Sequence, residues 1–160
     1  MFEIGDTVVH PQHGVGCIVK LEDREFERGT IRKYYEISMS DASTVWVGVD
    51  MPDSGLRQLA HKNELAHCRE ILLAQPEPLI EDGRVRQSKL VAQLKQGTIV
   101  TQCEVVRDLY AFVSHKPAYG TMPAFLEALL RALCQEWALV EGITTVEATS
   151  EIHSLLDQPR

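Results

Sequence analysis

The chain has 160 residues, of which 44% are hydrophobic and 24% are charged, a composition typical of a folded globular protein and not of a disordered one. Its formal net charge of −7 argues against a protein that binds DNA tightly by neutralising many phosphates. No apolar run approaches the roughly 18 residues that suggest a membrane span, and the acidic start of the chain is unlike a signal peptide, so we expect a cytoplasmic protein.

Short β-like segments alternate with turns in the first part of the chain. They are rich in Val, Ile, Tyr and Trp, which favours strands. The predicted strands are Thr7–His10, Val15–Glu22, Lys33–Ser38, Thr44–Val49 and Leu56–Leu59. Because closing several short antiparallel strands removes their exposed edges, we predict a small five-stranded barrel over residues 1–60.

Helical periodicity replaces this pattern after residue 60. A helix is predicted over 61–74, and Gln75-Pro76-Glu77-Pro78 then breaks it, which makes residues 61–82 a helix with a stiff connector. Residues 83–160 are expected to form a compact all-helical domain. Its helices are predicted over 84–96, over 98–114, from Thr121 to Gly142 and after Thr144, with a loop at 115–120. The predicted fold class is therefore α+β with two small domains.

Basic residues gather in one part of this acidic chain. Between residues 83 and 116 six basic side chains stand against only Glu104 and Asp108. Arg86 and Lys89 are three residues apart, which places them on one side of a helix. We predict a basic face of Arg84, Arg86, Lys89 and Lys95 that contacts DNA phosphates weakly, and the alternative is an ordinary solvated helix face.

Motifs for catalysis or metal binding are missing from the sequence. It has no Gly-rich phosphate loop, no G-x-S-x-G and no H-E-x-x-H. His10 and His13 flank a Pro-containing turn with no further ligand nearby, so a turn is the better interpretation than a metal pair. The four cysteines are widely spaced and are expected to be buried thiols. We therefore predict a protein that is not an enzyme and has no catalytic residues, metal or cofactor.

The two tryptophans lead to different expectations. Trp137 lies in the apolar stripe of its helix, which indicates a core position. Trp46 alternates with Val45 and Val47, so one of these two sets faces the interior of the barrel. If the valines face inward, Trp46 lies outside, where a tryptophan is a good interface anchor, and the alternative is a core tryptophan.

Several motifs point to one family. The opening Phe2-Glu3-Ile4-Gly5-Asp6 and the stretch His10-Pro11-Gln12-His13-Gly14 are followed by Thr44-Val45-Trp46-Val47 and Gly55-Leu56-Arg57. Glu104-Val105-Val106-Arg107-Asp108-Leu109-Tyr110 and Glu136-Trp137-Ala138-Leu139 lie in the second half. The set resembles the CarD/CdnL family of bacterial transcription regulators, and its N-terminal part is also similar to the polymerase-interacting domain of the transcription–repair coupling factor.

The resemblance implies a Tudor-like or SH3-like barrel that binds the β subunit of RNA polymerase and a helical domain that contacts upstream promoter DNA. It assigns Arg24, Trp46 and Arg57 to the polymerase side and supports Arg84, Arg86 and Lys89 of the predicted basic face as the DNA side. Members of the family insert a tryptophan wedge into the minor groove, a general means of holding distorted DNA. The corresponding place here falls near Gly83, and no aromatic residue occurs between Trp46 and Tyr110, so the wedge is missing.

These residues lead to two functional interpretations. The first is a monomeric CarD-like regulator that docks on polymerase, associates with the nucleoid through it and contacts promoter DNA weakly. The second is a protein-interaction adaptor that docks on polymerase or another protein and has no DNA role. The affinity for DNA of a complex between this protein and polymerase distinguishes the two interpretations.

Overall fold

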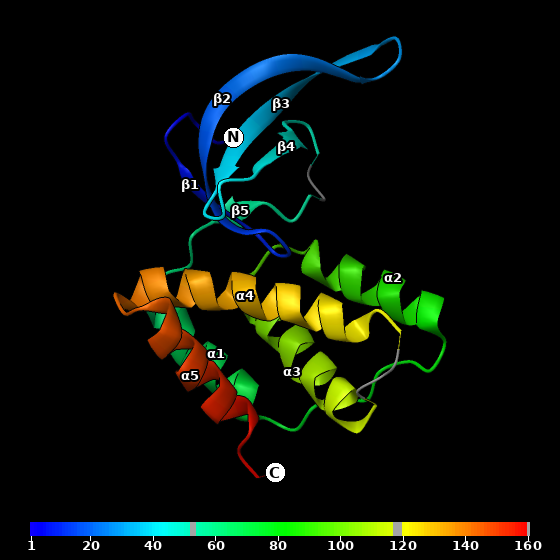
Figure 1. Ribbon diagram of the computed structural model, residues 1–160, viewed down its shortest axis with the longest axis vertical. Helices are drawn as coiled ribbons and strands as arrows, with labels where there is room; N and C mark the ends of the chain where they lie inside the picture. Colours follow the sequence, from blue (N-terminus) through cyan, green and yellow to red (C-terminus); the bar gives the residue numbers. More distant parts are fainter. Residues whose placement is uncertain (52–53, 117–119, 160) are drawn as a thin grey trace.

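The computed structural model describes residues 1–51, 54–116 and 120–159, which form an antiparallel sheet followed by a layer of helices (Figure 1). The strands are β1 (Thr7–His10), β2 (Gly14–Glu27), β3 (Thr30–Met39), β4 (Thr44–Gly48) and β5 (Arg57–Gln58). Their order in the sheet is β4-β3-β2-β1-β5. The predicted α+β class is therefore confirmed.

The sheet is curved but is not a closed barrel, and that part of the prediction is wrong. Strands β4 and β5 lie at the two ends of the strand order and do not pair with each other in the described part of the chain. Only Arg57 and Gln58 of β5 pair with β1, so this strand is too short to close the ring. The curvature of β2 comes with two register shifts against β3, because an extra residue bends the strand that carries it.

The β2–β3 hairpin is longer than the sequence predicts. Its pairing continues past Glu22 and Lys33 to Glu27 and Thr30, and Gly29 turns the chain with φ of +81°. The segment missed by the prediction is rich in charged residues because both of its faces lie beyond the hydrophobic core of the sheet. Figure 1 shows this hairpin projecting away from the helices.

The helices agree with the predictions to within one or two residues. They are α1 (Lys62–Leu73), α2 (Gly83–Leu94), α3 (Ile99–His115), α4 (Met122–Glu141) and α5 (Thr145–Leu156). The capping box of Thr144 and Glu147 is confirmed at the start of α5. Residues 117–119 of the loop predicted at 115–120 lie outside the described residues.

Two separate hydrophobic clusters hold the sheet and the helices. The sheet cluster contains Val8, Ile18, Tyr35, Ile37, Met39 and Val47. The helical cluster is larger and draws on α1 to α5, with Trp137 fully buried inside it, as predicted. In Figure 1 the sheet stands on one side of the helical layer, and α4 contacts it chiefly through β2 and β1.

Candidate functional site

An aromatic and basic cluster lies on the face of the sheet that points away from its hydrophobic core. We call it the outer cluster, and it consists of Arg24, Phe26, Tyr34 and Trp46. The guanidinium carbon of Arg24 lies 5.1 Å from the centroid of the Trp46 ring, a cation–π contact. The Phe26 ring packs edge-on against Tyr34 with centroids 4.8 Å apart, and it lies 6.0 Å from Trp46. Phe26 is 56% exposed, so the outer cluster presents apolar surface to solvent.

The orientation of Trp46 follows from strand alternation. Val47 is buried in the sheet cluster and Val45 packs against it, so the valines face inward and Trp46 faces outward. Trp46 is nevertheless half-buried, because Arg24 and Phe26 lie against it. Its Nε1 is buried and has no hydrogen-bond partner among the residues that the structure describes. A buried N–H without an acceptor is costly.

Strand β4, which carries Trp46, is an edge strand. It pairs with β3 along one side, and no other described strand pairs with its second side. An edge strand offers unpaired backbone groups that can extend into the sheet of another protein. The outer cluster and this edge therefore form one candidate protein-binding surface.

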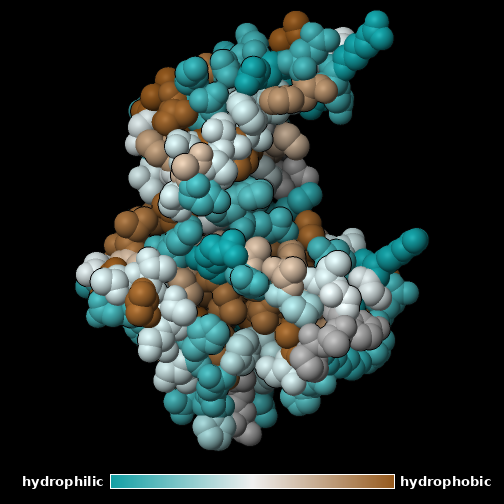
Figure 2. Space-filling model, viewed as in Figure 1, coloured by the Kyte–Doolittle hydropathy of each residue, from teal (hydrophilic) through white to brown (hydrophobic). Residues whose placement is uncertain are grey.

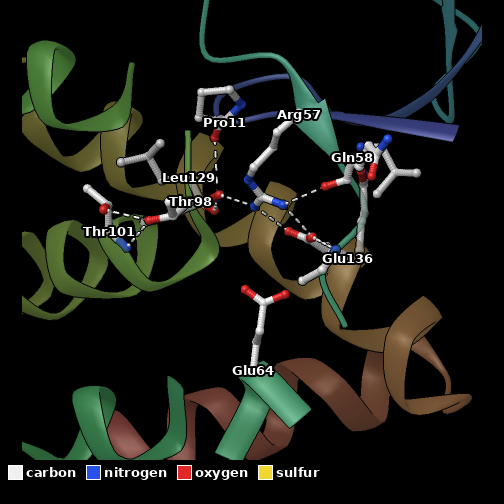
Figure 3. Close-up of polar contacts among 12 residues, drawn as sticks. Pro11, Arg57, Gln58, Glu64, Thr98, Thr101, Leu129 and Glu136 are labelled. Carbon is white, nitrogen blue, oxygen red and sulfur yellow. Dashed lines mark hydrogen bonds and ion pairs between the residues drawn. The ribbon is translucent and has the colours of Figure 1, made fainter. Parts of the chain in front are cut away.

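Arg57 does not belong to this surface, contrary to its predicted role in polymerase binding. Its side chain is only 13% exposed and points from β5 toward α4. Both of its terminal nitrogens donate to the carboxylate of Glu136, each over 2.6 Å (Figure 3). The guanidinium is thus used inside the molecule, and Arg57 is not retained among the proposed polymerase contacts.

Arg86 is also misplaced by the prediction of an exposed basic face. It is 4% exposed, since it lies four residues before Leu90 and eight before Leu94, on the buried side of α2. Its Nη1 donates to the carbonyl oxygens of Ile80 and Glu81, and its guanidinium carbon lies 4.6 Å from the ring centroid of Phe112. Arg86 therefore fixes the connector to the helices.

The other three predicted DNA-side residues are exposed on or next to α2. Arg84 and Lys89 line one shallow surface on the outer side of the helix, together with Ser88 and Ala92. Lys95 caps the C-terminal end of the same helix. Asp82 caps its start, accepting from the backbone N–H groups of Arg84 and Val85, and places a negative charge beside this face.

The motif around Arg107 and Asp108 has a structural role. Both side chains are buried, and Nε of Arg107 lies 2.8 Å from Oδ1 of Asp108. The same oxygen accepts a hydrogen bond from the backbone N–H of Glu77 over 2.9 Å. This pair therefore ties the connector to α3.

His10 and His13 lie next to each other, with ring centroids 4.5 Å apart. Nδ1 of His10 accepts hydrogen bonds from the backbone N–H groups of Gln12 and His13, so this nitrogen stabilises a turn. No group of three or more His, Cys, Asp or Glu side chains within the described ranges could hold a metal ion. No helix in those ranges is long and apolar enough to cross a membrane.

Comparison with known proteins covers both parts of the chain. Residues 2–60, which contain the whole sheet and the outer cluster, match the family described as CarD-like/TRCF RID domain. This stretch of the chain is similar to that family. The CarD-like RID domain is an RNA polymerase-interacting domain. A relative from Bacillus subtilis (strain 168), named "Putative transcription factor YdeB", is 29% identical over 152 residues, which cover 94% of this chain and 99% of the relative. The similarity to this relative therefore extends from the sheet through the helices.

Sequence reasoning missed two important groups. Phe26 of β2 was overlooked because it lies in a charged stretch without strand alternation. Glu136 was overlooked as a buried charge, although it follows Leu129 by seven residues and Leu133 by three, which places it on the apolar side of α4.

Proposed function

We propose that this protein is a transcription regulator that docks on the β subunit of RNA polymerase through the outer cluster and the outer edge of β4. One observation carries the proposal. The stretch that matches an RNA polymerase-interacting domain presents Trp46 on an edge strand, with Arg24 and Phe26 packed against it. Tryptophan and arginine are the residue types that dominate binding energies at protein interfaces. The name of the Bacillus relative agrees with a role in transcription.

We further propose that α2 contacts the phosphates of upstream promoter DNA when the protein is held on polymerase. Arg84, Lys89 and Lys95 carry this contact, and Arg86 takes no part because it is buried. Three cations beside Asp82, in a chain with a net charge of −7, give little affinity for DNA in solution. Docking on polymerase would raise the effective concentration of α2 near the DNA.

The burial of Arg86 also favours the second candidate function, an adaptor without a DNA role. It removes one of the four predicted cations from the surface of α2. The two candidates share the polymerase-docking surface and differ only in what α2 does.

Replacing Trp46 by alanine should weaken binding to the isolated β subunit by about 2 kcal/mol, which is roughly a 30-fold increase in Kd. The reason is the loss of the ring against which Arg24 and Phe26 pack. Isothermal titration calorimetry with the purified β subunit measures the change, and circular dichroism checks the fold.

Ile31→Ala is the matched control for this experiment. Ile31 is an exposed apolar residue of the β2–β3 hairpin, which carries Arg24 and Phe26, and it neighbours Arg32 in β3. Strand alternation places Ile31 on the opposite face from Arg32, which pairs with Arg24 of the outer cluster. An unchanged Kd for a folded Trp46→Ala variant, or an equal loss with Ile31→Ala, would remove Trp46 from the docking surface.

Replacing both Arg84 and Lys89 by alanine should shorten the lifetime of open promoter complexes. The dependence of DNA affinity on salt should also fall, by about one unit of log–log slope for each lost phosphate contact. Filter binding of polymerase–promoter complexes over a range of salt concentrations measures both effects. Lys62→Ala, which removes an exposed lysine from α1, serves as the control. Equal lifetimes with wild type and the double variant, both bound to polymerase, would establish the adaptor function instead.

A further inference from the structure

A buried polar network joins the sheet to the helices, and its residues take no part in the polymerase or DNA contacts of the proposed function. Its centre is the ion pair between Arg57 of β5 and Glu136 of α4, which lie 79 positions apart in the chain. Glu136 is 0% exposed, and its carboxylate also accepts a hydrogen bond from the backbone N–H of Ala60 over 2.8 Å. Figure 3 shows Arg57 extending from the sheet toward Glu136 on the helix beneath it.

Gln102 of α3 extends the network to the β1–β2 turn. Its Oε1 accepts from Nη2 of Arg57 over 3.2 Å. Its Nε2 donates to the carbonyl oxygens of Pro11 and Leu129, over 3.3 Å and 3.5 Å. A single buried amide therefore contacts the turn before β2, strand β5 and helix α4, and both its oxygen and its nitrogen are used.

A second contact lies beside the first on α4. Oε1 of Gln135 accepts a hydrogen bond from the backbone N–H of Val15 over 3.2 Å. A Cβ at position 14 would overlap this oxygen, and Gly14 has φ of +87°, so only glycine fits the turn there without strain. Two consecutive residues of α4, Gln135 and Glu136, thus hold two different segments of the sheet.

These contacts lie at the boundary between the sheet and the helices, so they can set the relative orientation of these two parts as well as stabilise the fold. The sheet and the helices have separate hydrophobic clusters, and the ion pair joins an element of one to an element of the other. On the face shown in Figure 2, hydrophilic residues cover much of the boundary between sheet and helices. An apolar contact tolerates sliding, whereas a bidentate arginine–carboxylate pair fixes direction. Buried ion pairs add little net stability over apolar pairs of similar volume, and fixing one arrangement is a role they serve in some proteins.

We infer that Arg57, Gln102 and Glu136 are positioning residues that hold the helical half in one fixed orientation relative to the RID sheet. The consequence for DNA rests on the proposed function: a sheet docked on polymerase would deliver α2 to one place beside the promoter. Without the network the chain between β5 and α1, residues 59–61, would act as a hinge. The effective concentration of α2 at the DNA would then fall.

The orientation is tested first in the full-length protein without polymerase. Residual dipolar couplings of ¹⁵N-labelled wild type should fit one alignment tensor for the residues of the sheet and of the helices together. In the double variant Arg57→Met/Glu136→Leu each half should keep its own internal couplings, while the common tensor is lost. Glu127→Leu/Arg131→Met removes a largely exposed ion pair from the same helix α4 and should keep the common tensor.

The alignment tensors of the variants test whether the network sets the orientation of the helices relative to the sheet. A common tensor retained in the folded Arg57→Met/Glu136→Leu variant would overturn the inference, because the network would not set the orientation. If that variant unfolds, the isosteric Glu136→Gln carries the same test: separate tensors support the inference and a common one overturns it.

The functional consequence is tested on polymerase. The folded double variant should bind the β subunit within about twofold of wild type, while the added affinity of the complex for upstream DNA falls by about tenfold. A wild-type protein that does not bind the β subunit would overturn the proposed function and leave the tensor result standing. Unchanged DNA affinity in a variant that has lost the common tensor would overturn the positioning role.

Discussion

Replacing Glu136 by alanine is expected to lower the free energy of unfolding by about 3–5 kcal/mol, among the largest effects of any single substitution in this chain. The carboxylate accepts three hydrogen bonds, two from Arg57 and one from the backbone N–H of Ala60, and it has no exposed surface. Its removal leaves the charge of Arg57 without its partner in a site where that side chain is 13% exposed. Urea unfolding followed by circular dichroism measures the loss.

The loss of stability in Glu136→Ala depends on leaving the charge of Arg57 unpaired. A second variant tests whether this unpaired charge is the cause. Arg57→Met/Glu136→Leu removes both charges and leaves no uncompensated ion, so it should be clearly more stable than Glu136→Ala. Glu127→Ala on the same helix breaks an ion pair whose side chains are mostly exposed, and it should cost less than about 1 kcal/mol. A loss below about 1 kcal/mol for Glu136→Ala would show that water readily solvates Arg57 at this boundary.

The helices were predictable from the sequence because their signals are local. Thr144 with Glu147 marks the start of α5, and Gly142 ends α4 with φ of +71°, a conformation that glycine adopts easily. Alternation likewise located β1, β2 and β4. The charged end of the β2–β3 hairpin was missed because neither face is buried there, so period two carries no hydrophobic signal.

The candidate site was only partly predictable, and the errors concern long side chains. The resemblance assigned Arg57 to the polymerase side, and Arg86 was placed on an exposed basic face because charged residues are mostly exposed. In the structure each has partners that one sequence does not reveal: Glu136 lies 79 positions from Arg57, and the carbonyls of Ile80 and Glu81 belong to the connector. Arg86, Leu90 and Leu94 are spaced four residues apart, and this spacing indicates that Arg86 lies on the buried face of α2.

In the outer cluster, packing decides between the two orientations of Trp46 that the sequence allowed. Trp46 was expected either inside or outside the barrel, and the burial of Val47 places it outside. Its partial burial comes from Arg24 and Phe26, which reach it from the neighbouring hairpin. Phe26 contacts Trp46 from 20 positions away because β2 and β3 extend beyond their predicted ends. Because the predicted strands ended too early, Phe26 was left out of the predicted site.

Lowering the pH from neutral to about 4 should destabilise the protein through His10, by up to about 3 kcal/mol. Burial, and secondarily the nearby His13, lower the pKa of His10 from 6.5 to about 4. Between these two values the unfolded chain binds more protons at this position than the folded chain does. The stability that neutral His10 provides is therefore complete above pH 6.5, falls as the pH drops and is lost near pH 4.

The physical cause is visible in the turn that joins β1 to β2. Nδ1 of His10 accepts hydrogen bonds from the backbone N–H groups of Gln12 and His13, both over 3.2 Å. Protonation would convert this acceptor into a donor that faces two other donors. The next residue, Pro11, receives the hydrogen bond from Gln102, so the disturbed turn is the one that contacts α3. Acid should therefore loosen the contact between sheet and helices before it unfolds the hydrophobic clusters.

His10→Asn separates this group from the other histidines of the chain. An asparagine oxygen can accept the same backbone hydrogen bonds and does not titrate in this range. The free energy of unfolding, measured in urea at pH 7.5, 6 and 5, should fall more steeply for wild type than for His10→Asn, and the exposed His13→Asn should keep most of the wild-type slope. Equal slopes for wild type and His10→Asn, or an NMR titration of His10 with a midpoint above pH 6, would contradict the assignment of acid sensitivity to this turn.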